Sequence, residues 1–395
     1  GSGKTPGCGI IERVGGVWFW VFVGPALVLA AVSLRGEGRR LDWVRTRLNA
    51  LQRSDWPQAT VIVPVKGHDE GLAENLGALA SLDYSNYELI VAARLATDIP
   101  PGVVPPGARV VLAGASDPDT GEKIANLLAA VAAARPESTV LAFADSDGRP
   151  QPGWLKALVL ALDQPEAAAA TGHRWDFPKR ASWESLARRV WNAIIAGGFG
   201  PGAPFAWGGA TAIRREDFAA LRIADYWRGH VSDDWRLTHA VRDSGRRIAF
   251  APGAMVAARD STGWSGFLEW ATRQLILTRV HEPKLWSLSA FATTWYCASM
   301  VVCIRAGLEG NPVGPLCLAA QIGAGTWKSW SRLRLARVPF PEESGWLRRW
   351  GWSQLALVAP VTWVWLYTHA ASAFRSTIRW RGNRYRLSRA GAKRL

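Results

Sequence analysis

Cysteine is scarce in this chain of 395 residues. The four cysteines, Cys8, Cys297, Cys303 and Cys317, include no CxxC pair and have no histidine at metal-ligand spacing, which argues against a thiolate metal site. The last three lie in apolar stretches, and a free cysteine behaves as a small hydrophobe. We therefore expect them to be buried packing residues.

Acidic side chains are also few: the chain has 32 Asp and Glu against 47 Lys and Arg, which gives a formal net charge of +15. Such a charge predicts a polyanionic partner, which could be nucleic acid, an anionic lipid surface or a phosphorylated substrate. The basic residues concentrate in 35–47, 328–349 and 375–394, beside apolar segments, where membrane topology already accounts for them. We therefore expect no nucleic-acid partner.

Charged residues make up 20% of the chain and hydrophobic residues 49%, with a mean hydropathy near zero. This composition excludes both a disordered chain and a pure membrane bundle, and it predicts a soluble domain with a few membrane spans. Of the basic residues, 8 are Lys and 39 are Arg, a bias that favours a bacterial source.

The first long apolar run, residues 17–34, is uncharged and has the length of a bilayer span, with Trp18 and Trp20 as interface anchors. Basic residues are denser after this run than before it, so the positive-inside rule places the following segment in the cytoplasm. We predict a transmembrane anchor over 1–35 and a basic juxtamembrane linker over 36–58. A cleaved signal peptide is the alternative.

Residues 59–284 alternate short apolar runs with longer amphipathic stretches. The runs that predict strands are 59–65, 87–93, 109–113 and 139–144. The stretches whose periodicity predicts helices are 71–81, 122–134 and 153–164. This alternation is typical of an α/β domain whose parallel sheet is covered by helices on both faces.

Membrane-like composition returns over 285–395, with apolar segments at 285–304, 312–327 and 352–374. The tail after them is basic and has no acidic residue, so it belongs on the cytoplasmic side with the α/β domain. An even number of crossings must therefore join the two, and we expect the segment broken by Pro360 to be re-entrant or interfacial. The C-terminal membrane region then has two to three helices, and a multi-pass protein of the bacterial inner membrane is favoured.

Two acidic pairs stand where predicted elements begin or end. Strand 139–144 runs directly into Asp145-Ser146-Asp147, and an open α/β sheet binds its ligand beyond the carboxyl ends of its strands. These two carboxylates can hold a hard divalent cation against a diphosphate. The pair Asp233-Asp234 opens a later helix, so one carboxylate can cap that helix while the other points into the cleft as a base.

Basic and amide side chains are expected at the same edge of the sheet. Lys66 and Asp69 follow the first strand. Lys123 and Asn126 stand at i and i+3 on the first turns of a helix, where both can face a phosphate together with the helix amino-terminus.

In this order the motifs resemble those of family 2 type glycosyltransferases of the GT-A fold, and most closely the ceramide glucosyltransferases. KGHD (66–69) resembles the first signature Asp of that family, DSD (145–147) the second and SDDW (232–235) the third. The segments EKIANL, WGGATAIRRED and, near the carboxyl end, IRWRGNRYRL resemble segments at corresponding places. The resemblance implies a GT-A (Rossmann-like) cytosolic glycosyltransferase domain over 59–284, an N-terminal anchor, and C-terminal membrane helices with a basic cytosolic tail over 285–395.

The resemblance also implies an inverting transfer of a hexose, glucose favoured, from a UDP-sugar to a lipid hydroxyl, with a ceramide-like acceptor favoured. Asp234 would be the general base, with Asp233 as the alternative, and Asp145 and Asp147 would bind Mg or Mn. The implied nucleotide-sugar contacts are Lys66, Asp69, Lys123, Asn126, Asp145, Asp233, Arg273 and Gln274. The alternatives are a transferase for a hopanoid, diacylglycerol or polyprenyl phosphate, and a processive polysaccharide synthase.

One signature of the family departs from its pattern here. Gln or Arg, two residues and then Arg-Trp should fall at 273–277, but Ile276 and Leu277 replace the Arg-Trp pair. An aliphatic pair can neither stack on a sugar nor pair with a phosphate. Arg273, Gln274 and Arg279 remain as candidate diphosphate contacts. The uridine-binding Asp that many members carry after the second strand is also missing, which favours Asp69 as the nucleotide contact.

Aromatic and histidine residues complete the candidates. Rings offer flat apolar faces to sugars and lipids, which makes candidates of Trp175, Trp207, Trp380 and Tyr385. Scattered histidines that we expect to be hydrogen-bonded polar residues are His173, His230, His239 and His281.

Overall fold

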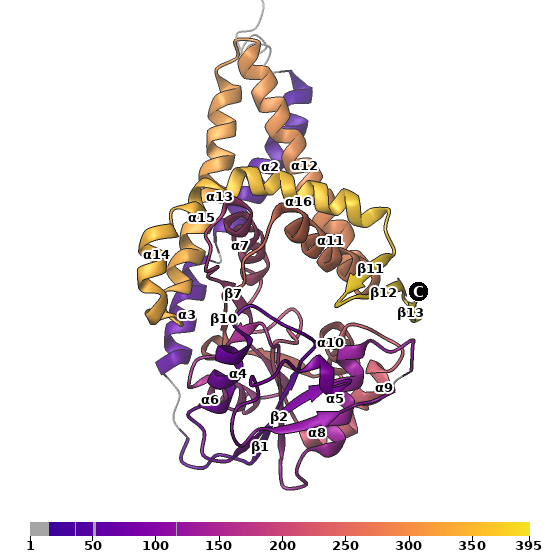
Figure 1. Cartoon of the computed structure of the whole chain (residues 1–395). Helices are drawn as coiled ribbons and strands as arrows, with labels where there is room; N and C mark the ends of the chain where they lie inside the picture. Colours follow the sequence, from indigo (N-terminus) through magenta and orange to yellow (C-terminus); the bar gives the residue numbers. More distant parts are fainter. Residues whose placement is uncertain (1–15, 36, 50–52, 116) are drawn as a thin grey trace, which may run out of the picture.

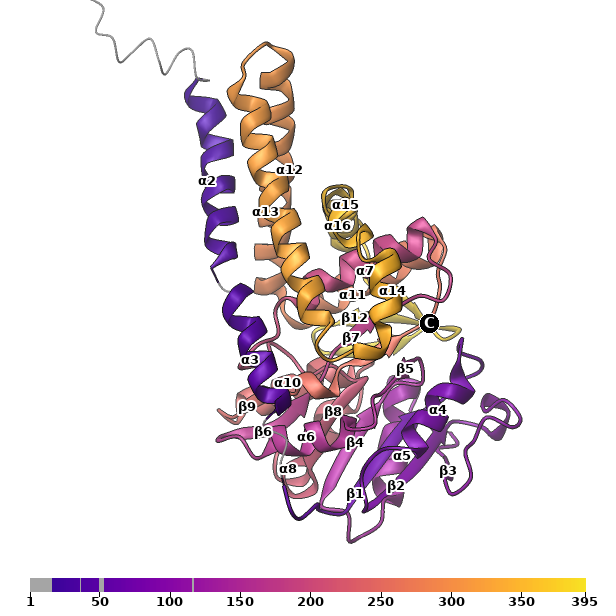
Figure 2. The same cartoon turned by 90° about the vertical axis from the view of Figure 1, so that its left-hand side faces the viewer.

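The computed structural model describes residues 16–35, 37–49, 53–115 and 117–395. An α/β domain occupies one end of the molecule, a long helix bundle projects at the other, and shorter helices lie between them (Figure 1, Figure 2). Cys8 and the first part of the predicted 1–35 anchor lie outside the described residues.

A seven-stranded sheet forms the centre of the α/β domain, in the order β3-β2-β1-β4-β8-β6-β9. Its strands are β1 (Ala59–Pro64), β2 (Tyr87–Ala93), β3 (Arg109–Leu112), β4 (Val140–Ala144), β6 (Ala167–Thr171), β8 (Ala210–Arg214) and β9 (Arg247–Phe250). The four predicted strands are confirmed to within one residue at each end. Strands β3, β2, β1 and β4 are parallel, as expected.

The sheet is mixed rather than wholly parallel, because β8 runs antiparallel to both of its neighbours, β4 and β6. Ala210 at the start of β8 pairs with Ala144 at the end of β4. The loop before β8, with Trp207, Gly208 and Gly209, therefore lies beside the acidic turn that follows β4. The expectation of a parallel sheet failed here because a run of small apolar residues carries no information on strand direction.

The alternation of side chains along β1 shows why helices cover both faces. Val61 and Val63 are buried on one face with helices α4 and α6, and Ile62 is buried on the other face with α5. Burying each such side chain stabilises the fold by roughly 1.5–3 kcal/mol. The predicted helices are thus confirmed, with the bounds α4 (Leu72–Ala80), α5 (Glu122–Ala133) and α6 (Trp154–Leu162).

A small second sheet, β5-β10-β7, lies next to the acidic turn. Its strands are β5 (Gly148–Arg149), β7 (Arg174–Asp176) and β10 (Val256–Ala258). Because β5 and β7 both pair with β10, the residues 147, 174 and 260 converge on one place. The remaining helices of the domain are α7 (Trp183–Ala196), α8 (Arg215–Ala220), α9 (Ile223–Trp227), α10 (Asp233–Asp243) and α11 (Trp264–His281).

Three helices pack side by side in the projecting bundle: α2 (Val17–Leu34), α12 (Pro283–Leu308) and α13 (Val313–Ala336) (Figure 2). Among the described residues, α2 and α12 are long and apolar enough to cross a membrane. Cys303 and Cys317 are buried between these helices, and Cys297 is buried on α12, as expected for packing residues. The predicted linker contains a further helix, α3 (Glu37–Asn49), whose Leu41 and Val44 pack with Leu335 of α13.

The third C-terminal apolar segment forms α16 (Val358–Ala373), which runs across the base of the α12 and α13 hairpin rather than along it (Figure 1). Pro360 lies in its first turn, where a missing N–H breaks no intrahelical bond. Short helices α14 (Ser344–Trp350) and α15 (Ser353–Ala356) precede it. The chain therefore leaves the α/β domain along α12 and returns towards it along α13.

The tail itself folds into a three-stranded antiparallel sheet, β11 (Thr377–Trp380), β12 (Asn383–Ser388) and β13 (Gly391–Arg394). This sheet lies beside α11 and the α/β domain (Figure 1). Its position gives the carboxyl end of the chain access to the site described next.

Candidate active site

A cavity of about 550 Å³ opens beyond the carboxyl ends of β1 and β4 and extends beneath α11, α12 and α16. The residues predicted from the sequence that line it are Lys66, Lys123, Asn126, Asp145, Asp147, Asp233, Asp234, Arg273 and Gln274. Asp69 adjoins this wall, because Ser146 Oγ donates a hydrogen bond to Asp69 Oδ2 at 2.6 Å. The structure thus brings all ten predicted residues to one place.

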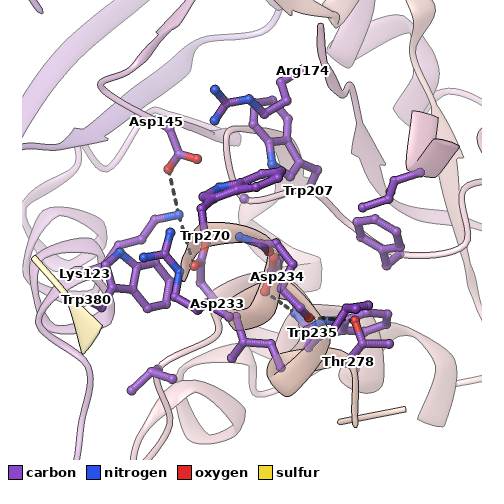
Figure 3. Close-up of a pocket in the computed structure, with 18 of the residues that line it drawn as sticks. Lys123, Asp145, Arg174, Trp207, Asp233, Asp234, Trp235, Trp270, Thr278 and Trp380 are labelled. Carbon is purple, nitrogen blue, oxygen red and sulfur yellow. Dashed lines mark hydrogen bonds and ion pairs between the residues drawn. The ribbon is translucent and has the colours of Figure 1, made fainter. Parts of the chain in front are cut away.

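Lys123 lines the cavity between two carboxylates (Figure 3). Its Nζ lies 2.7 Å from Asp145 Oδ1 and 3.1 Å from Asp233 Oδ1. Burial disfavours the charged ammonium, but Asp145 and Asp233 outweigh burial and raise the pKa of Lys123 above its ordinary value. Asn126, one turn further along α5, is buried and its Oδ1 makes no hydrogen bond among the described residues, so this oxygen can accept one from a ligand.

The amino-terminus of α10 presents Asp233 and Asp234 to the cavity. Ser232 is the N-cap residue and accepts from Trp235 N at 3.4 Å. Asp234 Oδ1 accepts from the same N–H at 2.7 Å, so one of the two carboxylates does bind the amino-terminus of the helix, as expected. Burial raises the pKa of Asp233 to about 6, against the pull of Lys123. Burial also raises the pKa of Asp234, although a hydrogen bond from Ser232 Oγ opposes this.

The two oxygens of Asp234 differ in their surroundings. Oδ1 accepts hydrogen bonds from Ser232 Oγ and, at 2.7 Å, from Trp235 N. Oδ2 makes no hydrogen bond to another described residue. The local bonds therefore fix the carboxylate while leaving one oxygen to accept a proton from a ligand in the cavity.

Arg174 holds the second carboxylate of the acidic turn. Its guanidinium donates to Asp147 Oδ2 at 3.1 Å, to Asp176 at 3.2 Å and to Asp260 at 3.1 Å. Burial raises the pKa of Asp147, and Arg174 opposes the rise. Sequence reasoning missed Arg174 and Asp260, because their approach depends on the pairing of β7 and β5 with β10.

The two carboxylates of the acidic turn fit one kind of metal site. Among the described residues, no group of three or more His, Cys, Asp or Glu side chains could enclose a metal ion. A hard cation can instead be held by one or two carboxylates together with water and phosphate oxygens. Asp145 and Asp147 each use one oxygen in an ion pair and keep the other for a cation.

Several of the predicted aromatic contacts line the cavity, namely Trp207, Trp380 and Tyr385. Trp175 does not, because it is buried in a core cluster and faces the guanidinium of Arg189 at 5.7 Å, so the expectation for it is wrong. His173 also departs from expectation. It is buried on the cavity wall against Phe199, and neither ring nitrogen has a hydrogen-bond partner among the described residues.

The cavity changes character along its length. Its inner end is lined by the carboxylates and cations described above. Its other end lies under the helix bundle and is lined by apolar and aromatic side chains, among them Ile194, Ile195, Leu285, Trp286 and Trp365. One ligand with a polar and an apolar part would therefore be matched by the two ends.

The aliphatic pair in α11 has a packing role. Ile276 and Leu277 are buried and contact the C-terminal sheet through the cluster that contains Tyr385. Arg279 donates to the backbone oxygens of Ala373 and Arg375 and does not line the cavity, so the expected diphosphate contact for it is wrong.

Comparison with known proteins identifies the class of this α/β domain and its acidic cavity: the chain is a glycosyltransferase. The model of glycosyl transferase family 21 matches residues 19–393, nearly the whole chain. The protein therefore belongs to glycosyl transferase family 21. No curated protein matches the chain significantly in sequence.

Solved structures resemble the chain distantly. A mycobacterial protein is 18% identical with a TM-score of 0.38, over 58% of this chain and 79% of that chain. Glucosyl-3-phosphoglycerate synthase from Mycobacterium tuberculosis, in complex with Mn2+ and UDP-glucose, is 18% identical with a TM-score of 0.36, over 57% of this chain and 84% of that chain. The same enzyme in complex with Mn2+, UDP and phosphoglyceric acid is 18% identical with a TM-score of 0.38, over 60% of this chain and 81% of that chain. At this distance the similarity carries no information on substrates.

Proposed function

We propose that this protein transfers a hexose, glucose favoured, from a UDP-sugar to the hydroxyl group of a membrane lipid, with inversion at the anomeric carbon and a ceramide-like acceptor. One observation carries the proposal. The cavity is continuous from the carboxylates at the sheet edge to the aromatic and apolar wall beneath the helix bundle. A sugar nucleotide suits the first end and a lipid chain suits the second.

Charge at the inner end supports a diphosphate donor. The ammonium of Lys123 and the amide of Asn126 lie on the first turns of α5, where the positive end of the helix dipole adds to their attraction for phosphate. Asp145 and Asp147 would hold Mg or Mn beside them. When bound, the cation would neutralise charge that develops on the departing diphosphate.

Asp234 is the proposed general base. Its Oδ1 is fixed by Trp235 N and Ser232 Oγ, and Oδ2 remains to take the proton of the attacking hydroxyl. Asp233 is less suited, because Lys123 binds its carboxylate at 3.1 Å and stabilises the form that has lost its proton. We therefore assign Asp233 to the positioning of Lys123 and the donor.

Membrane attachment would bring the lipid to the site. Helices α2 and α12 have the length and composition of spans, and α12 begins beside the apolar end of the cavity, here called the apolar arm, which it lines with Leu285, Trp286 and Ser289. In this arrangement the α/β domain lies on the cytoplasmic face, which is where the basic tail also belongs. A lipid hydroxyl at the interface could then enter from the side of α12 and α16.

Product analysis of purified membranes tests the proposal. The full chain is incubated with labelled UDP-glucose, Mg or Mn, and separate acceptors: ceramide, diacylglycerol, a hopanoid and a polyprenyl phosphate. We expect label in ceramide, requiring the divalent cation and absent from the Asp234→Asn variant. Label in another lipid would overturn the ceramide assignment, and a long labelled polysaccharide would overturn lipid transfer in favour of a polymer synthase.

A further inference from the structure

The C-terminal sheet, β11 to β13, is attached to the catalytic domain at several points. Asn383 Nδ2 donates to Glu122 Oε2 at 2.9 Å, at the amino-terminus of α5. Ala392 N donates to Gly229 O at 2.8 Å, in the segment before α10. Apolar side chains that join the sheet to Ile276 and Leu277 of α11 are Ile378, Tyr385 and Leu387. The sheet is therefore part of the domain and holds a fixed position beside the cavity.

The turn between β11 and β12 carries an arginine in an unusual backbone conformation. Arg381 and Gly382 both have positive φ, 49° and 82°. Two-residue turns of this kind favour Asn-Gly, because a residue with a large side chain is strained at the first position. Strain of this kind persists where the surrounding structure requires the side chain at that point. The turn places Trp380 and Arg381 in the lining of the cavity.

Arg381 is bound to Asp69 through both carboxylate oxygens. Nη1 lies 2.7 Å from Oδ1, and Nη2 donates to Oδ2 at 2.9 Å. Asp69 also accepts the hydroxyl of Ser146, the residue between Asp145 and Asp147. Asp69 therefore ties the arginine to the acidic turn. These contacts and a hydrogen bond from Nη1 to Lys66 O at 3.4 Å use three of the five N–H donors of the guanidinium, and the other two are left for a ligand.

Electrostatics place Arg381 in the same site as the candidate metal ligands. Burial disfavours its charged form, but the carboxylates of Asp69, Asp147 and Asp145 outweigh burial and raise its pKa. The guanidinium is thus firmly charged. Carboxylates of the domain also bind four other cations of the cavity, namely Lys66, Lys123, Arg174 and Arg188. Arg273 lines the cavity too, but its Nη1 donates to Arg379 O at 3.3 Å and its guanidinium lies 5.4 Å from the ring centroid of Trp380.

We propose that Arg381 binds the diphosphate of the donor nucleotide and that Asp69 holds it in position, so that the C-terminal sheet is part of the donor site. A planar guanidinium matches the geometry of phosphate oxygens. The aliphatic pair Ile276 and Leu277 of α11 contributes no charge. It packs against the C-terminal sheet, whose β11–β12 turn carries Arg381. The inference rests on the proposed function, because it takes a nucleoside diphosphate as the ligand.

Binding measurements on the full chain in detergent, with Mn2+ present, test the proposal without depending on the acceptor. UDP is titrated directly, and uridine is measured by displacement of a fluorescent UDP analogue. Arg381→Met should raise the Kd of UDP about tenfold or more while the Kd of uridine changes less than about twofold, because uridine carries no phosphate. Arg381→Lys keeps the positive charge but loses the planar guanidinium, so its Kd for UDP should lie between those of the wild type and Arg381→Met. Arg386→Met, on the exposed face of the same sheet, is the matched control and should bind as wild type.

Three outcomes would overturn the inference. If Arg381→Met weakened the binding of UDP and of uridine equally, Arg381 would act only by stabilising the fold. In that case Arg381→Met and Arg381→Lys would also show the same fall in melting temperature. An unchanged Kd of UDP in Arg381→Met would remove Arg381 from the donor site and leave the proposed function intact. Failure of the wild-type chain to bind either UDP or uridine would overturn the inference and the proposed UDP-sugar donor together.

Discussion

Lys123 Nζ lies 2.7 Å from Asp145 Oδ1, so an ion pair joins the first turn of α5 to the acidic turn after β4. The same ammonium reaches Asp233 at the start of α10. Three elements from distant parts of the sequence therefore meet at one buried charge. The arrangement couples the proposed metal ligands to the proposed base helix.

Replacement of Lys123 by Met should damage both function and stability. It leaves two carboxylates without their cation, and breaking a buried pair on one side costs about 3–5 kcal/mol. We expect a lower apparent melting temperature and a loss of kcat/KM of about a hundredfold or more, since a preorganised cation is lost from the reacting centre. Lys156→Met, which breaks a pair with the exposed Asp83, is the control and should cost about 1 kcal/mol or less. Equal effects of the two variants would contradict the central role of Lys123.

Asp234→Asn should separate chemistry from binding. The amide is nearly isosteric but cannot accept a proton, so we expect kcat to fall by roughly 10²–10⁴ while the Kd of UDP stays within about twofold. Steady-state transfer and UDP titration measure the two effects. Asp243→Asn, at the exposed end of the same helix, should leave both unchanged. If Asp233→Asn abolished turnover and Asp234→Asn did not, the base would have to be reassigned.

On the acid side, the rate of transfer should fall at a pH above the ordinary pKa range of aspartic acid side chains. A general base works as the carboxylate, and burial raises the pKa values of Asp233, to about 6, and of Asp234. Activity is therefore lost as the pH falls through these raised values, with the two groups titrating as a pair. Ser232→Ala removes a hydrogen bond that lowers the pKa of Asp234, so it should move the acid limb to higher pH. A limb that stays in place, or shifts to lower pH, would argue against Asp234.

The fold and the site were predictable from sequence to different degrees. The strands ending at 64 and 144 and the helix carrying Lys123 follow from local periodicity, and they were placed to within two residues. The direction of β8 could not be predicted from local periodicity, because it depends on pairing with β4 and β6 across the sheet. The burial of Trp175 likewise depends on partners far away in the chain.

The ion pair between Arg381 and Asp69 is the clearest case of a contact that the sequence alone does not predict. The two residues are 312 positions apart, and neither has a local pattern that names the other. Sequence reasoning grouped Asp69 with the acidic turn because both follow neighbouring strands. The charge of the carboxyl tail predicts on which side of a membrane it lies, but it does not predict that Arg381 reaches the cavity.

The glycines before β8 should not tolerate a side chain. A Cβ at Gly208 would collide with Asp233 Oδ2 and lie 2.9 Å from Lys123 Nζ. Gly208→Ala should therefore displace the ion pair and lower kcat/KM by about tenfold or more, with a small loss of melting temperature. Gly263→Ala, where a Cβ meets nothing within 4 Å, is the matched control. Full activity in Gly208→Ala would mean that the loop moves freely and does not position Asp233.

The apolar arm of the cavity offers a test of where the lipid lies. Ser289 of α12 lines this arm, whereas the preceding Leu288 is 67% exposed and does not line it. Ser289→Trp fills space that a lipid chain would use, so we expect transfer to lipid to fall by about tenfold or more with the Kd of UDP unchanged. Leu288→Trp adds an indole to the outer face of the same helix and should leave transfer within about twofold. The comparison cancels any general effect of a new aromatic residue on membrane insertion. If both variants transferred the sugar equally well, the acceptor would have to enter by another path, and the apolar arm would have no part in binding it.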